Sequence, residues 1–136
     1  MLLIEISLSE GRASEAAAAY NKMNKTPLSI GDIYTQLQNN IPISKDVPAR
    51  AYAVEGKRDQ AIAEYERLTS ADPKAREYML IHPFCRLRLA RLYEASGERA
   101  KAIAQYDTLA VIWKNADQGL SEVQEAKERL AALKGH

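Results

Sequence analysis

The chain has 136 residues, of which 46% are hydrophobic, and this is the size and composition of one soluble domain. Its 19 basic and 18 acidic residues nearly cancel, so no overall field favours nucleic acid or an anionic membrane as a partner. No apolar run reaches about 18 residues, and the opening Met-Leu-Leu-Ile is interrupted by Glu5, which excludes a signal-peptide core. A single cysteine excludes an internal disulfide. We therefore expect a cytoplasmic protein.

Apolar residues at helical spacing predict helices along the whole chain. In order, they are expected at residues 2–9, 12–24, 29–39, 46–55, 57–70, 74–81, 84–96, 99–114 and 121–134. Asp46 is expected to cap its helix, with Pro48 tolerated in the first turn. The sequence Ser-Glu-Val-Gln at residues 121–124 has the form of a capping box, in which a serine and a Glu or Gln three residues on cap the helix start.

A spacing of glycine, alanine, tyrosine and a large aliphatic residue occurs three times in this chain. Counting from the glycine, the alanine follows after five residues, the tyrosine after nine and the aliphatic residue after twelve. The three sets are Gly11, Ala16, Tyr20 and Met23; Gly56, Ala61, Tyr65 and Leu68; and Gly97, Ala102, Tyr106 and Leu109. This is an internal repeat, in which the glycine turns the chain between two helices.

The repeat also extends to the residues before each glycine. An alanine lies seven residues before and a tyrosine four residues before in the second and third copies, where they are Ala49, Tyr52, Ala90 and Tyr93. The first copy has Ile4 and Ser7 at these two places. A small alanine lets two helices approach closely, so we expect Ala61 and Ala102 to be buried at helix contacts, with the tyrosines in the wider gaps.

These residues resemble the tetratricopeptide repeat family, in which a helix-turn-helix of about 34 residues carries a Gly, Ala, aromatic and Pro pattern. Residues 49–73 match most fully, up to Pro73. The glycines are 45 and 41 residues apart, which departs from the family period. The resemblance implies an all-α fold, an α-solenoid of antiparallel helix pairs in a superhelix. It implies one domain over residues 1–136, with units at 1–28, 29–73 and 74–117 and a capping helix at 121–134.

The sequence carries no pattern typical of an enzyme or a metal site. His82 and His136 are isolated from Cys, Asp and Glu at ligand spacing, and Cys85 lies among apolar residues as a core cysteine would. Tyrosines beside arginines can stack nucleic-acid bases, but here they repeat at core positions, which favours a structural role. Trp113 is expected to seal the stack against the last helix. We expect no catalysis, no cofactor, no metal, no membrane and no nucleic acid.

The first helices of the repeats carry the strongest functional signal, because in this family they line the concave groove. Arg50 and Arg91 occupy equivalent places, and Phe84, Leu87 and Glu94 are expected on the same side of the third unit. Guanidinium binds carboxylate through two parallel hydrogen bonds, so this groove would suit a peptide or protein with an acidic group. The alternative is that both arginines are solvated and paired with neighbours such as Asp46 or Glu94.

The predicted function is a non-catalytic scaffold or adaptor that binds a protein or peptide in its groove. The alternative is a regulatory segment of a larger bacterial signalling enzyme or transcription regulator. The first unit has a short leading helix, so the helix at residues 12–24 should leave apolar surface uncovered. A weak homo-oligomer through this N-terminal face is therefore also expected.

Overall fold

The structure is a computed structural model that describes residues 2–24, 45–70, 83–117 and 119–135. All secondary structure among these residues is helical, which confirms the all-α class. The helices are α1 (Leu2–Ser9), α2 (Ala13–Asn24), α4 (Val47–Val54), α5 (Arg58–Thr69), α6 (Pro83–Ala95), α7 (Arg99–Ile112) and α8 (Ser121–Lys134). The chain divides into two compact units, Met1–Leu80 and Ile81–His136, and each is described by itself.

Two of the expected helices, at residues 29–39 and 74–81, lie outside the described residues. The expected repeat boundaries at 28/29 and 73/74 lie there as well, so the domain boundaries stay predictions. Within the described part of the chain, no helix combines the length and the apolar character needed to cross a membrane.

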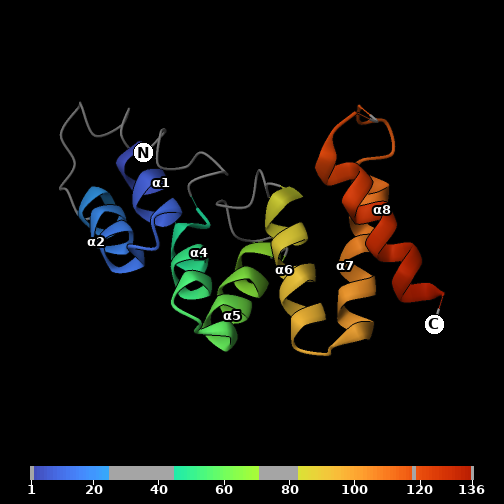
Figure 1. The fold of residues 1–136 in the computed structure, drawn as a ribbon, viewed down its shortest axis with the longest axis horizontal. Coiled ribbons are helices and arrows are strands. Elements are labelled where there is room, and N and C mark those ends of the chain that lie inside the picture. Colours follow the sequence, from blue (N-terminus) through green and yellow to red (C-terminus); the bar gives the residue numbers. More distant parts are fainter. Residues whose placement is uncertain (1, 25–44, 71–82, 118, 136) are drawn as a thin grey trace. The chain divides into compact units, whose positions relative to one another are not determined.

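Unit 1 contains two helix hairpins, α1 with α2 and α4 with α5 (Figure 1). Helix α2 packs against α4, and α1 also touches α4. The core between these three helices consists of small and medium aliphatic side chains: Ile4, Leu8, Ala13, Ala16, Val47 and Ala51. Alanine and valine at the contact bring the helix axes close together.

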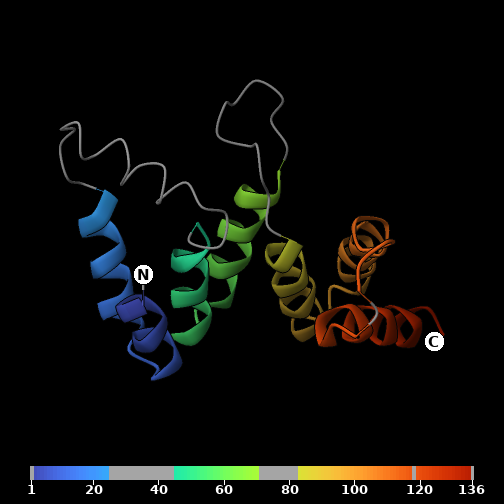
Figure 2. The ribbon, with the colours of Figure 1, turned by 90° about the horizontal axis from the view of Figure 1, so that it is seen from above.

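Unit 2 contains the hairpin of α6 and α7, with α8 packed against α7 (Figure 2). Its interior includes Leu87, Leu89, Tyr106 and Leu109. Cys85 is buried on α6, as the sequence predicted for a core cysteine. Helix α8 contributes Val123 and Ala126 to this interior, while its Lys and Arg side chains are exposed.

All three hairpins turn through the same glycine conformation. Gly11, Gly56 and Gly97 have φ angles of 75°, 74° and 74°. In each turn, the amide after the glycine donates to a carbonyl five residues earlier, over 2.7 Å at Arg12, 2.9 Å at Lys57 and 2.8 Å at Glu98. This is the Schellman arrangement that closes a helix with a left-handed residue. The glycine that recurs in the sequence therefore marks the same backbone turn in all three hairpins.

We expect Gly97→Ala to lower the free energy of unfolding by about 1–2 kcal/mol, which is the cost of a left-handed conformation for a residue with a Cβ. No atom lies within 4 Å of a Cβ built at Gly97, so the cost is conformational and not steric. Urea denaturation followed by circular dichroism measures this change. Gly97→Asn should cost less, because asparagine tolerates this conformation better. Equal losses for alanine and asparagine would contradict the explanation.

The repeat alanines have the same burial in the three hairpins. Ala16, Ala61 and Ala102 are each 0% exposed, which confirms the prediction of buried alanines at helix contacts. Tyr65 and Tyr106 are buried as well, and Tyr20 is half-buried. In the first copy, Ile4 and Ser7 are buried where the other copies have alanine and tyrosine. The alanine positions of the sequence repeat are therefore core positions in the structure.

Neither predicted helix cap forms a side-chain capping bond, although Asp46 is the N-cap residue of α4 as predicted. The Asp46 side chain makes no capping hydrogen bond at the start of α4, because its carboxylate is bound elsewhere. At α8, the N-cap residue is Leu120, and Ser121 already lies in the helix, where its hydroxyl donates to Glu122 over 2.8 Å. A serine inside the first turn cannot cap it, so the capping box does not form.

Candidate functional site

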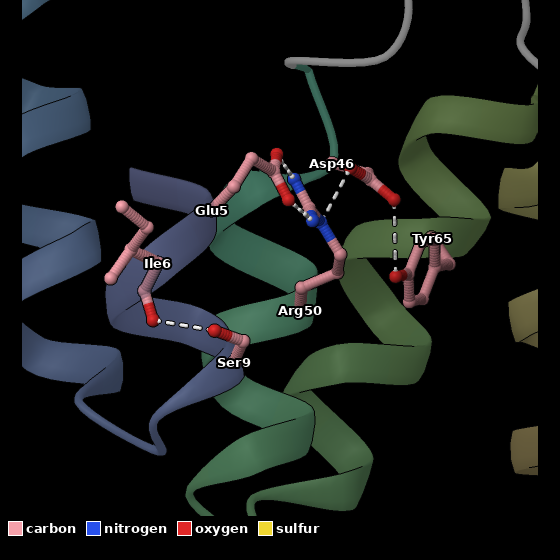
Figure 3. A network of polar contacts seen from close by, with 6 residues as sticks. All are labelled: Glu5, Ile6, Ser9, Asp46, Arg50 and Tyr65. Atoms are coloured by element: carbon pink, nitrogen blue, oxygen red, sulfur yellow. Dashed lines mark hydrogen bonds and ion pairs between the residues drawn. The ribbon is translucent and has the colours of Figure 1, made fainter. Parts of the chain in front are cut away.

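Arg50 is the centre of a polar network that joins α1, α4 and α5 (Figure 3). Its Nη1 and Nη2 donate to the two carboxylate oxygens of Glu5 over 2.6 and 2.7 Å. Its Nε donates to Oδ1 of Asp46 over 3.0 Å. Tyr65 donates its hydroxyl to Oδ2 of the same aspartate over 3.4 Å. We call these four residues the Arg50 site.

The two carboxylates of the Arg50 site differ in their access to water. The Asp46 side chain is 1% exposed and the Glu5 side chain is 45% exposed, while that of Arg50 is 16% exposed. A buried carboxylate needs a charged or hydrogen-bonding partner, so Asp46 fixes the direction of the guanidinium from inside. Glu5 closes the outward side of the same guanidinium.

Arg50 keeps its charge at all physiological pH values. Burial lowers its pKa, but the hydrogen bond to Glu5 and the charges of Asp46 and Glu5 raise it by more, so the net shift is upward. The site therefore offers a permanent cation whose affinity for an anion depends on ionic strength much more than on pH.

Arg91 holds a carboxylate in a similar way in unit 2. Its Nε donates to Oε1 of Glu125 over 2.7 Å, and its Nη2 donates to Oε2 of the same residue. Both side chains are partly open to water, at 45% for Arg91 and 29% for Glu125. We call this pair the Arg91 site. Each of the two repeat-equivalent arginines is thus bound at two nitrogens by one glutamate from a neighbouring helix.

Glu94 is bound by a tyrosine. It does not pair with Arg91, which was one of the two ion pairs suggested from the sequence as the alternative to ligand binding. Tyr106 donates its hydroxyl to Oε2 of Glu94 over 2.7 Å, and Arg129 approaches the other oxygen at 3.7 Å. Burial and this hydrogen bond raise the pKa of Tyr106 above its ordinary value of 10.0, so the hydroxyl stays a donor. The other half of that alternative, Arg50 with Asp46, is present in the structure.

A single register position explains why the two repeat tyrosines use different carboxylates. Asp46 and Leu87 each lie ten residues before their glycine, and both are buried. In unit 1 this position offers an acceptor to Tyr65, whereas in unit 2 its leucine offers none and Tyr106 bonds to Glu94. A buried hydroxyl requires such a partner.

The predicted groove residues lie in different environments. Leu87 is 1% exposed and belongs to the interior of unit 2. Phe84 is half-buried, meets the ring of Trp113 edge-on with 6.2 Å between centroids, and lies under the guanidinium of Arg88 at 5.8 Å. Arg91 and Glu94 lie in the polar contacts between α6 and its neighbours. Arg50 lies in the other unit.

Sequence reasoning missed Glu5 and Glu125 as partners of the arginines. Glu5 lies six residues before Gly11, just as Arg50 and Arg91 lie six residues before their glycines. Opposite charges at one register position of adjacent helices are the signal that could have identified the Glu5 pair. Glu125 follows Arg91 by 34 residues, about one period of the resembled family.

We expect the Arg91 site to make stability depend on pH. The hydrogen bond from Arg91 lowers the pKa of Glu125 below its ordinary value of 4.5. Its contribution to stability is therefore complete above 4.5 and is lost as the pH falls through the lowered value. Glu125→Gln should cost about 0.2–1 kcal/mol at neutral pH and nothing in strong acid. Urea denaturation across a pH series measures this difference, and a constant difference at every pH would contradict it.

Comparisons with protein-family models, with curated proteins and with solved structures found no match. No group of three or more His, Cys, Asp or Glu side chains that could hold a metal ion is present in the described ranges. The geometry of the Arg50 and Arg91 sites is therefore the basis for a functional proposal.

Proposed function

We propose that this chain is a non-catalytic protein-interaction module of the cytoplasm, a tetratricopeptide-like stack that binds an acidic peptide or protein along its leading helices. The leading helices are those that precede the repeat glycines, α1, α4 and α6. One observation carries the proposal: Arg50 and Arg91, at the same register position, each hold a glutamate through two hydrogen bonds. Both guanidiniums are thus already oriented for a carboxylate.

Exchange of an internal glutamate for a ligand carboxylate is energetically accessible. Ion pairs open to water contribute about 0.2–1 kcal/mol, so replacing the Arg91–Glu125 pair by an equivalent pair costs little. At Arg50, the buried Asp46 keeps the Nε bond during such an exchange, and the two Nη groups remain directed outward. A ligand would gain its affinity from these contacts together with apolar contacts beside them.

Packing within unit 1 supports the helical-repeat arrangement in this proposal, because α2 of the first hairpin packs against α4 of the second. The three turns have the same glycine conformation, and the three alanines at the helix contacts are fully buried. Consecutive hairpins of this kind bury their apolar faces against one another in helical repeat proteins, and a last helix with a polar outer face ends the stack. Helix α8, with its exposed Lys and Arg side chains, fits that role.

The test is capture of partners by the full chain, followed by direct affinity measurement. The Arg50→Lys/Arg91→Lys variant keeps both charges but loses the bidentate geometry, and it should reduce affinity at least tenfold. Arg67→Lys on the return helix α5 is the matched control, because Arg67 also holds a glutamate, Glu64, through two nitrogens. Partner binding that survives the double substitution would reject the proposal.

A further inference from the structure

Helix α1 packs against the other helices of unit 1 through one narrow face. Ile4, Ser7 and Leu8 are buried on this face, and Ile4 and Leu8 contact a cluster formed by α2 and α4. The opposite face is open, with Leu2 and Leu3 exposed at 74% and 77%. A helix of eight residues is not stable alone in water, so its contacts with α2 and α4 keep α1 helical.

Glu5 adds a directional contact to this apolar face. It precedes the buried Leu8 by three residues and follows the buried Ile4 directly, and its two oxygens bind Arg50. The residues of α1 that contact the other helices therefore form a pattern. Position 4 is aliphatic, position 5 is acidic, position 7 is small and position 8 is aliphatic. This is how an amphipathic helix occupies a groove, with anchors at helical spacing.

We infer that the surface of α2 and α4 around Arg50 is a docking site for an apolar helix that carries one carboxylate, and that α1 is its internal occupant. The inference rests on the proposed function of the Arg50 site and names the partner that this site takes. The partner is a helical segment of another protein with the pattern of residues 4–8: aliphatic, acidic, any residue, small, aliphatic.

The other three residues of the Arg50 site, Asp46, Arg50 and Tyr65, would keep their contacts when α1 leaves with Glu5. Asp46 and Tyr65 belong to the α4 and α5 part of the network, and the bond from Arg50 Nε to Asp46 does not involve α1. The vacated surface would then present an oriented guanidinium beside Ala16, Val47 and Ala51. An internal segment competes at an effective concentration on the order of millimolar, so a partner helix must bind better than α1 or meet a chain in which α1 is weakened.

A competition experiment with the full chain tests this inference. The probe is a fluorescein-labelled peptide with the sequence of residues 1–11, and its binding is measured by fluorescence anisotropy. Glu5→Gln in the chain weakens the internal occupant, so the peptide should bind this variant about two- to fivefold more tightly than the wild type. Ile4→Ala should raise the affinity at least tenfold, because it removes the buried anchor of α1. Circular dichroism verifies that both variants remain folded.

Two further measurements separate the possible outcomes. Arg50→Lys in the Glu5→Gln chain should abolish the gain in affinity, as should a peptide in which the glutamate corresponding to Glu5 is replaced by glutamine. Peptide affinity that is the same for the wild type and for folded Glu5→Gln and Ile4→Ala chains would overturn the inference. If partner capture still depended on Arg91 in that case, the proposed function would stand without it.

A second copy of this chain is the other candidate occupant. Sedimentation that shows a wild-type dimer, lost on Arg50→Lys, would assign the site to α1 of the second copy and would overturn the assignment to another protein. A monomer at the same concentrations, together with the expected peptide affinities, would support a partner helix.

Discussion

Arg50→Met should lower the free energy of unfolding by about 3–5 kcal/mol, the usual cost of removing one partner of a buried ion pair. The substitution takes the Nε donor from the Asp46 carboxylate, whose side chain is 1% exposed. Methionine has similar length and no charge, so the aspartate would lose a cation at a place that water hardly reaches. Urea denaturation monitored by circular dichroism measures the loss.

Arg91→Met is the matched control for this prediction. Arg91 lies at the same register position, but both it and Glu125 are partly open to water, so its loss should cost at most about 1 kcal/mol. Adding Asp46→Leu to Arg50→Met should restore part of the stability, because the equivalent position in unit 2 is the buried Leu87, although Tyr65 loses its bond to Asp46. Equal losses for Arg50→Met and Arg91→Met would contradict the role of Asp46.

Ala102→Leu should lower the free energy of unfolding by about 1–3 kcal/mol, because it forces extra methylenes into a close helix contact. Ala102 is 0% exposed on α7, where its place in the repeat lets α6 approach. Leucine has an equal or better helix propensity than most residues, so the loss would report crowding and not a weaker helix. Thermal and urea denaturation both measure it.

Ala104→Leu is the control on the same helix. Ala104 is exposed, so leucine there has no close neighbour to displace, and stability should change by less than about 0.5 kcal/mol. A loss at Ala104 as large as that at Ala102 would mean that the repeat alanine is not the contact that sets the helix spacing.

The core of the described helices could be predicted from the sequence because it depends on spacing. The glycine conformation and the burial of Ala61 and Ala102 follow from helical period and from steric limits on the backbone, which are local properties. Helix ends were right to within two residues for each helix that the structure describes, with α1 and α8 matching at both ends. The spacing of the repeat residues was therefore enough to predict these features.

The candidate site could be predicted only in part, because its contacts join residues that are far apart in the chain. Asp46 stands before a helix, where a cap is the local expectation, but a partly buried arginine and a tyrosine bind its oxygens instead. Leu87 shares a helix face with Arg91, yet it lies at the register position of Asp46, which faces the interior. Which neighbour supplies a carboxylate to each arginine is decided by tertiary structure.

The central claim is that Arg50 and Arg91 are oriented carboxylate sites whose internal glutamates can be exchanged. Side-chain NMR of arginine-labelled chain, titrated with an acidic helical peptide, tests it most directly. We expect the Nη signals of Arg50 to shift while its Nε signal keeps its position, because Asp46 retains the Nε bond. For Arg91, we expect both the Nε and the Nη signals to shift, because Glu125 binds both nitrogens and would be replaced. A peptide that binds without moving any signal of either arginine would contradict the claim.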